Sequence, residues 1–288
     1  MFDFINKIII SLIFILFNSY SAYSTLKNAP EGAAVAVCST TGNMIAADQG
    51  SCRTTPSKYL IKIFEMGLCT THPFTTDGTK TDLVTMNRAN CSTTFLATDQ
   101  TNGFPVDIAD VIGGGISLEG ANTRAPIGTY GFPYIILGKA FTVNVSIIGS
   151  DSNTYVGRSN GSVNTSGPTD LVDNLTNFSA PGECKSGYVG AVIPIGTIDA
   201  FLTNAAEERS HHTEYTNPVC DKNGKLVGII NLTAPVTITA NTTKMQFNFI
   251  ISDYGINMED SNDAGNWPNT FGSSPFSGTF IFEEAPQQ

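Results

Sequence analysis

Charged residues are scarce in this chain. Asp, Glu, Lys and Arg make up 14% of the 288 residues, whereas roughly 25% is usual in soluble domains. Disordered chains combine few apolar residues with high net charge, but here apolar residues reach 41%. The composition therefore argues against disorder and predicts a folded chain whose polar surface consists mainly of hydroxyl and amide groups.

Basic residues are the scarcer of the charged residues. The 15 Lys and Arg residues are outnumbered by 25 Asp and Glu residues, which gives a formal net charge of -10. A protein that binds nucleic acid neutralises phosphates with Lys and Arg, and this chain has no excess of either. We therefore expect no nucleic-acid partner.

Glu and Lys, which favour helices, are few as well, while Thr, Asn, Gly, Val and Ile are frequent. Only residues 198–209 predict a helix, because Thr197 can cap them and Ile198, Phe201 and Leu202 fall on one stripe. The remaining pattern indicates an all-β protein. We expect an antiparallel β-sandwich, jelly-roll or immunoglobulin-like, with one short helix and long polar loops.

Alternation of apolar and polar residues marks the expected strands. Residues 59–68 are apolar on both faces except for Lys62 and Glu65, so we expect them to form a central strand. The other expected strands are residues 141–147, 225–233, 236–238, 245–251 and 279–283, with 236–238 and 245–251 paired as a hairpin.

Residues 149–183 are rich in Ser, Asn, Thr and Gly and offer few apolar anchors. We interpret them as a polar excursion from a single sandwich domain of residues 25–288, because neither half of the chain contains a complete set of strands. Two domains with a boundary in this region are the alternative.

The longest apolar run lies near the N-terminus. Residues 8–17 form this run, and small residues at Ala22 and Ser24 follow it. The pattern is typical of a secretory signal peptide of residues 1–24, with a mature chain that begins near Thr25. An uncleaved membrane anchor is the alternative, although the run is shorter than the roughly 20 residues that cross a bilayer. We expect a protein in the periplasm, at the cell surface or secreted, without a transmembrane segment in the mature chain.

All six cysteines follow the predicted signal peptide, and an even number in an oxidising compartment indicates disulfides. No two cysteines are two to four residues apart, as a structural zinc site requires. Spacing along the chain favours three pairs: Cys38 with Cys52, Cys69 with Cys91, and Cys184 with Cys220.

An acidic segment near the C-terminus could bind calcium through oxygen ligands. Its carboxylates are Asp253, Glu259, Asp260 and Asp263. The spacing departs from the EF-hand loop, because the twelfth position from Asp260 is Phe271 instead of Glu. An ordinary acidic turn is the favoured interpretation, and we expect no other cofactor.

Adjacent histidines could also bind a metal. His211 and His212 lie near Glu207, Glu208 and Glu214. The two histidines are not one helical turn apart, as in a metallohydrolase helix. A solvated segment is therefore the favoured interpretation.

One short motif resembles that of a hydrolase. Ser159 stands in a GxSxG pattern, and Asp173 or Asp199 and then His211 follow it in the order of an α/β-hydrolase triad. The nucleophile of such an enzyme needs a buried strand before it and a helix after it, whereas polar residues flank Ser159 on both sides. We interpret the motif as a glycine-rich surface loop.

Flat aromatic side chains could bind sugars. Tyr130, Phe132, Tyr134 and Trp267 are the candidates. The same residues are equally suited to a hydrophobic core, and a single Trp makes the carbohydrate interpretation the weaker one.

In its general character the chain is similar to bacterial surface-fibre and pilin-like subunits and to virion surface proteins. We expect a non-enzymatic structural or adhesion protein that acts through protein contacts or self-assembly. A secreted module that binds carbohydrate or calcium is the alternative, and a secreted hydrolase is a third possibility. Residues 33–37, apolar and small, are expected to form the first strand of their own domain, with donation to a neighbouring copy as the alternative.

The export signal and the cysteine pairs generate a prediction. Protein isolated from its native compartment should begin near Thr25 and contain no free thiol. Intact mass spectrometry and thiol labelling of the unfolded, unreduced chain would measure both. Recovery of residues 1–24 would contradict cleavage, and labelled cysteine would contradict complete pairing.

Overall fold

The computed structural model describes residues 8–10, 26–27, 36–47, 49–74, 84–110, 114–175, 188–193, 195–209, 224–261, 266–274 and 276–285. All regular elements within these ranges are strands, mostly paired in antiparallel sheets that pack together as in a β-sandwich. The predicted all-β fold is confirmed. The strands are β1 (Ile8–Ile10), β2 (Leu26–Lys27), β3 (Ala36–Val37), β4 (Ser51–Thr54), β5 (Lys58–Cys69), β6 (Val84–Thr85), β7 (Cys91–Ala97), β8 (Phe104–Asp107), β9 (Gly114–Ile116), β10 (Gly120–Asn122), β11 (Gly128–Tyr130), β12 (Phe132–Gly138), β13 (Ala140–Asn144), β14 (Ser146–Ile148), β15 (Thr154–Gly157), β16 (Val163–Asn164), β17 (Leu171–Asn174), β18 (Tyr188–Ile193), β19 (Gly196–Thr203), β20 (Glu208–Arg209), β21 (Lys225–Leu232), β22 (Val236–Ile238), β23 (Thr242–Ile250), β24 (Ile256–Glu259), β25 (Thr270–Ser273) and β26 (Ser277–Glu284).

The largest sheet has β5 at its centre. Its main path runs β10-β7-β5-β12-β21-β19-β18-β2, and β8, β13 and β17 join beside it. The twelve residues of β5 pair with β7 and β8 along one edge and with β12 and β13 along the other. The central strand expected from residues 59–68 is confirmed. Its side chains can be apolar on both faces because both faces are covered.

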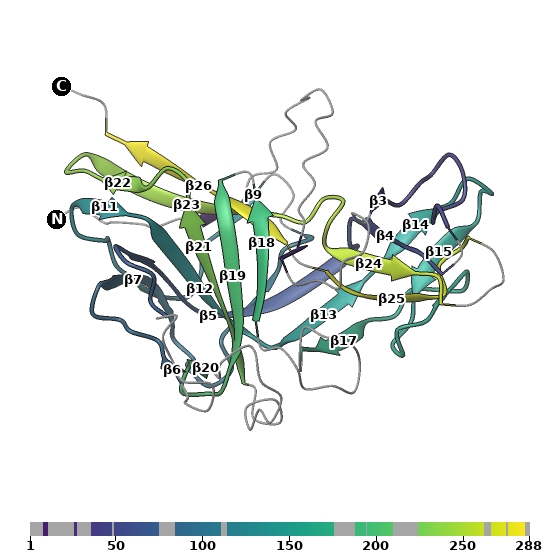
Figure 1. Ribbon diagram of the computed structural model, residues 1–288, viewed down its shortest axis with the longest axis horizontal. Helices are drawn as coiled ribbons and strands as arrows, with labels where there is room; N and C mark the ends of the chain where they lie inside the picture. Colours follow the sequence, from purple (N-terminus) through teal and green to yellow (C-terminus); the bar gives the residue numbers. More distant parts are fainter. Residues whose placement is uncertain are drawn as a thin grey trace.

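Smaller sheets lie beside the large one. A four-stranded sheet has the order β25-β24-β4-β3, and β14, β15 and β16 form a three-stranded sheet. Figure 1 shows the large sheet on the left and these two sheets on the right, with β5 and β13 reaching toward them. The principal core lies among these elements, and in it the Tyr59 ring packs against Phe141 and Phe276 with centroids 5.6 and 5.9 Å apart.

The prediction of a helix at residues 198–209 is wrong. Residues 196–203 form β19, which pairs with β21 in continuous register from Gly196 opposite Leu232 to Thr203 opposite Lys225. β18 occupies its other edge. The apolar stripe was short, and backbone pairing with two neighbouring strands outweighs such a weak helical preference.

Two other local expectations need correction. Residues 236–238 and 245–251 do form strands, but not a hairpin, since β22 pairs with β11 and β23 with β26. The strand expected at residues 141–147 is divided at Val145 into β13 and β14, which belong to different sheets. Within the expected polar excursion, residues 149–175 contribute β15, β16 and β17.

Two of the three expected disulfides are confirmed. Cys38 is bonded to Cys52, and Cys69 to Cys91. Cys184 and Cys220 lie outside the described residues, so their pairing stays a prediction. Of the strand expected at residues 33–37, Ala36–Val37 form β3 beside β4 of the same chain, and residues 33–35 lie outside the described residues.

In the part of the chain that the structure describes, no helix has the length and apolar character needed to cross a membrane. The signal peptide and its cleavage remain predictions.

Close packing between β5 and β12 gives a testable prediction. Gly67 lies opposite Tyr134, and a Cβ atom on Gly67 would come within 2.4 to 2.5 Å of the tyrosine ring. Gly67→Ala should therefore lower the free energy of unfolding by about 2 kcal/mol. Urea denaturation would measure the loss. Gly131→Ala is the matched control, because nothing lies within 4 Å of its added Cβ; equal effects of both changes would contradict the packing argument.

Candidate functional site

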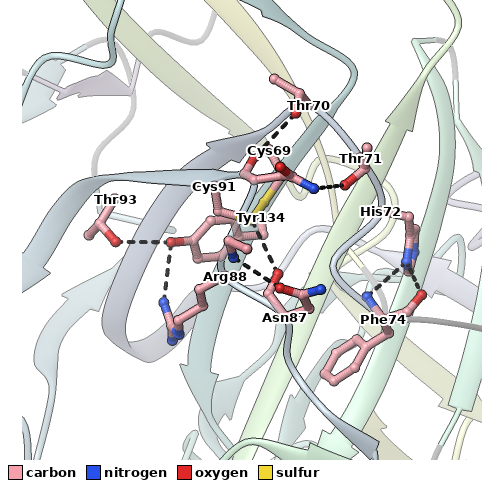
Figure 2. Close-up of a disulfide and its surroundings, with 12 residues drawn as sticks. Cys69, Thr70, Thr71, His72, Phe74, Asn87, Arg88, Cys91, Thr93 and Tyr134 are labelled. Atoms are coloured by element: carbon pink, nitrogen blue, oxygen red, sulfur yellow. Dashed lines mark hydrogen bonds between the residues drawn. A yellow bond between two sulfur atoms is a disulfide. The ribbon is translucent and has the colours of Figure 1, made fainter.

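The most highly organised polar site surrounds Glu65 on β5. Glu65 is buried, with 6% of the residue exposed, and the residues beside it in the strand are apolar. Its Oε1 atom accepts hydrogen bonds from the Arg88 guanidinium, from the Tyr134 hydroxyl at 2.5 Å and from the Thr93 hydroxyl at 2.9 Å. The Tyr134 and Thr93 hydroxyl oxygens are also 3.2 Å apart, and Figure 2 shows Thr93, Tyr134 and Arg88 converging. A buried carboxylate requires this degree of compensation.

Arg88 extends the site across the face of the sheet. One of its terminal nitrogens bonds Glu65 and the other bonds Glu207 in the turn between β19 and β20. Glu207 also accepts a hydrogen bond from Lys225 on β21 at 2.9 Å. Glu65, Arg88, Glu207 and Lys225, which we call the charged network, thus alternate in sign and connect four parts of the chain.

The turn that carries Glu207 has an unusual backbone conformation. Glu207 has φ of 63°, a left-handed conformation that non-glycine residues seldom adopt. Asn204 stabilises the turn, since its side-chain oxygen accepts hydrogen bonds from the backbone N–H groups of Ala206 and Glu208. The conformation points the Glu207 carboxylate toward both cations.

Burial and ion pairing oppose each other in the pKa values of the network. Burial by itself would raise the pKa of Glu207, but the hydrogen bonds from Lys225 and Arg88 outweigh it and lower that pKa. Burial likewise opposes the charged form of Arg88, yet the bonds to Glu65 and Glu207 raise its pKa. Burial, followed by the negative charge of Glu65, raises the pKa of Tyr134, so the phenol remains a donor.

The segment that carries Arg88 is fixed to β5 by several contacts. Cys91 is disulfide-bonded to Cys69 at the end of β5, and the Thr70 N–H donates to the Asn90 carbonyl at 2.9 Å. On the other side of the segment, the Asn87 N–H donates to the Pro73 carbonyl at 2.8 Å. Figure 2 shows Thr70 and Asn87 near the Cys69–Cys91 disulfide.

His72 lies beside this region. Its Nδ1 atom is close to both the N–H and the carbonyl of Phe74, and its Nε2 atom is 3.4 Å from a carboxylate oxygen of Asp199. Its ring packs edge-on against Phe132 and Phe201. Asp199 therefore contacts His72, whereas His211, the histidine considered with Ser159, lies outside the described residues.

The charged network consists of side chains that are paired with one another. Its two carboxylates and two cations are paired with one another, and the neighbouring Tyr134 and Thr93 hydroxyls already hold hydrogen bonds to Glu65. A general base or nucleophile must instead be able to exchange a proton with a substrate. The ion pairs connect the Arg88 segment and the turn at Glu207 to β5 and β21.

The residues of the acidic segment, which was considered as a calcium site, contact different partners. The Asp253 N–H donates to the Thr55 hydroxyl, Glu259 accepts from the Asn257 side chain, and the Asp260 N–H donates to the Gly50 carbonyl. Asp263 lies outside the described residues, as do His211, His212 and Glu214. Among the residues that are described, no group of three or more His, Cys, Asp and Glu side chains could hold a metal ion.

Ser159 lies in the turn between β15 and β16, two short antiparallel strands. The Arg158 N–H donates to the Ser162 carbonyl and the Gly161 N–H to the Arg158 carbonyl, closing the turn. A strand-turn-helix elbow is therefore not present around Ser159. Asp173 accepts two hydrogen bonds from Ser273, through its N–H and its hydroxyl.

The candidate sugar-binding aromatics do not form a common surface. Tyr130 and Tyr134 are buried, and their hydroxyls bond Pro126 and Glu65 respectively. Trp267 stacks on Tyr155, with ring centroids 5.4 Å apart and planes 9° from parallel. Phe132 packs against a separate hydrophobic cluster that includes Tyr134.

Comparison with known proteins adds no assignment. No family model matches the chain, and no curated protein or solved structure matches it either.

The lowered pKa of Glu207 predicts how the charged network responds to pH. Because the folded-state pKa lies below the unfolded value, its stabilisation is present above the unfolded value of about 4.3 and is lost as pH falls through the folded value. Glu207→Gln should lower the free energy of unfolding at pH 7, because it removes the ion pairs with Arg88 and Lys225. The loss should be about 1 to 2 kcal/mol, since Arg88 is partly exposed and solvent weakens its pair. Urea denaturation at pH 7 and pH 3 should show a smaller difference at pH 3. An equal difference at both values would contradict this role.

Proposed function

We propose that the protein is an exported, non-enzymatic structural or adhesion-type surface protein, comparable to a pilin-like, surface-fibre or virion-like subunit. One observation chiefly supports this: the charged side chains of its most organised polar site are paired with each other and connect loops to a sheet. Binding through such a protein takes place on its surface.

The disulfides also support this function. Cys38–Cys52 and Cys69–Cys91 fix short segments to the ends of β4 and β5. Disulfides persist in oxidising compartments, where they stabilise domains exposed to dilution and proteases. Together with the apolar run at residues 8–17, they favour export to the periplasm, the cell surface or the medium.

Surface labelling would test the proposal. Intact cells of the source organism would be treated with a membrane-impermeant amine reagent, for which partly exposed lysines such as Lys58 are available. The protein should be labelled before lysis or recovered from the periplasm or medium, whereas a cytosolic control protein should not. Labelling only after lysis, together with recovery in the cytosolic fraction, would contradict the proposal.

Calcium titration would separate the structural function from a calcium-dependent binding module. The structural function predicts the same melting temperature in a chelator and in millimolar Ca²⁺. A module saturated to about 100 times its dissociation constant would gain about 2.7 kcal/mol. Mg²⁺ at the same concentration is the control, and a rise specific to Ca²⁺ would favour the binding module.

A further inference from the structure

Lys58, Asn144 and Asp170 form a row across three neighbouring strands. Asn144, at the end of β13, lies opposite Lys58 at the start of β5. On the other edge of β13, Val143 lies opposite Leu171. The next pair in this antiparallel register is Asn144 with Asp170, which directly precedes β17. Figure 1 shows β5, β13 and β17 side by side. Side chains at directly opposite positions share one face of a sheet and lie within reach of each other.

The Lys58 side chain reaches across Asn144 to the third position of this row. Its Nζ atom donates to Asp170 Oδ2 at 2.5 Å, and Asn144 Nδ2 donates to Oδ1 of the same carboxylate at 3.2 Å. Two strand spacings of about 4.8 Å each separate Lys58 from Asp170, and the strand between them carries Asn144. The lysine amine and the asparagine amide therefore meet on one carboxylate.

The Asn144 amide is both buried and polarised. Asn144 is 8% exposed, and its Oδ1 atom accepts a hydrogen bond from the Val145 N–H at 2.8 Å. A backbone N–H in this position stabilises the negative charge that develops on the oxygen when a nucleophile attacks the amide carbon. Burial also limits the access of bulk water, which is the competing nucleophile.

We propose that Lys58 and Asn144 become joined by an isopeptide bond within the chain, with Asp170 as the catalytic residue that transfers the protons. This goes beyond the proposed function, because it assigns a self-modification to the chain. The amine, the amide carbon and the proton carrier are held together by the fold. Attack is therefore intramolecular, which removes most of the entropic barrier that the same groups face in water.

The reaction needs no further reactant. Asp170 takes a proton from the Lys58 ammonium, and the free amine attacks Cγ of Asn144, so that the Nζ–Cγ bond forms and an electron pair moves onto Oδ1. Asp170 then gives its proton to Nδ2 and takes a second one from Nζ as the Cγ–Nδ2 bond breaks. The products are a secondary amide and ammonia, which accepts the remaining proton and leaves as ammonium. Asp170 returns to the carboxylate form.

The resting ion pair makes this reaction slow. The hydrogen bond to Asp170 raises the pKa of Lys58, and the negative charges of Asp107 and Asp110 add to this effect. The bond from Lys58 in turn lowers the pKa of Asp170. An ammonium group is not a nucleophile, so only the minor form in which the proton has moved to Asp170 reacts. Both side chains are partly exposed, so ammonium can leave, and the cross-link accumulates because its release is not reversed in dilute solution.

Intact mass spectrometry would test the bond on the purified, disulfide-bonded chain, incubated at neutral pH and sampled over several days. The unchanged chain should lose the mass of one ammonia molecule, and tryptic digestion after reduction should yield a peptide pair joined through Lys58 and Asn144. Lys58→Arg keeps a positive charge beside Asp170 but removes the nucleophile, so its mass should stay constant. Lys244→Arg is the matched control, because Lys244 is also paired with a carboxylate at 2.5 Å, that of Glu283, and the loss should be unchanged.

A further variant tests the catalytic residue. Asp170→Asn keeps the size of the side chain but cannot carry the protons, so it should slow the loss of ammonia at least about 100-fold. The inference would be overturned by a constant mass of the unchanged chain, by equal loss in Lys58→Arg, by an undiminished rate in Asp170→Asn, or by conversion of Asn144 to Asp. If Lys58→Arg does not fold, the joined peptide pair in the unchanged chain decides the outcome.

Failure of this test and failure of the proposed function are distinguishable. Absence of the cross-link would leave the surface location unaffected. A cross-linked Lys58 would not react with an amine reagent, but Lys62 in the same strand is exposed and keeps the surface-labelling test independent.

Discussion

A carboxylate at the centre of a β-sheet is tolerated only if donors and positive charge surround it, and this constraint organises one face of the large sheet. Glu65 lies in β5, the strand on which most of the sheet depends, and its oxygen accepts bonds from Arg88, Tyr134 and Thr93. The bond from Arg88 to Glu65 places the Arg88 segment over the sheet. Arg88 also pairs with Glu207, which in turn pairs with Lys225. Loops that could otherwise leave the sheet are thereby fixed to it.

The sequence predicted best those features that depend on local pattern. Residues 59–68 were recognisable as a central strand because apolar side chains occupy both faces, and the pairs Cys38–Cys52 and Cys69–Cys91 followed from spacing. The prediction of a helix at residues 198–209 is wrong because a short apolar stripe suits a helix as well as a strand. The segment forms a strand because it pairs with β18 and β21, and a local pattern cannot predict where those two strands lie.

The charged network was only partly visible in the sequence. Glu65 was notable as a charged residue in an apolar strand, but nothing near it identified its partners. Arg88 follows 23 residues later, and Glu207 is 119 residues beyond Arg88. Their meeting depends on the order β5, β12, β21 and β19 across the sheet. Ser159 shows the converse case: its motif resembles that of a hydrolase, but its polar neighbours indicate a surface loop, and it lies in a hairpin turn.

The disulfide at the end of β3 has a mechanical consequence for any tension that enters through the residues before Ala36. Such a pull would separate Ala36 and Val37 from β4, but separation would stop at Cys38. From there the load passes covalently into Cys52, in the middle of a sheet whose next strand is β24. Residues 39–51 are bypassed and are not drawn out while this disulfide is intact.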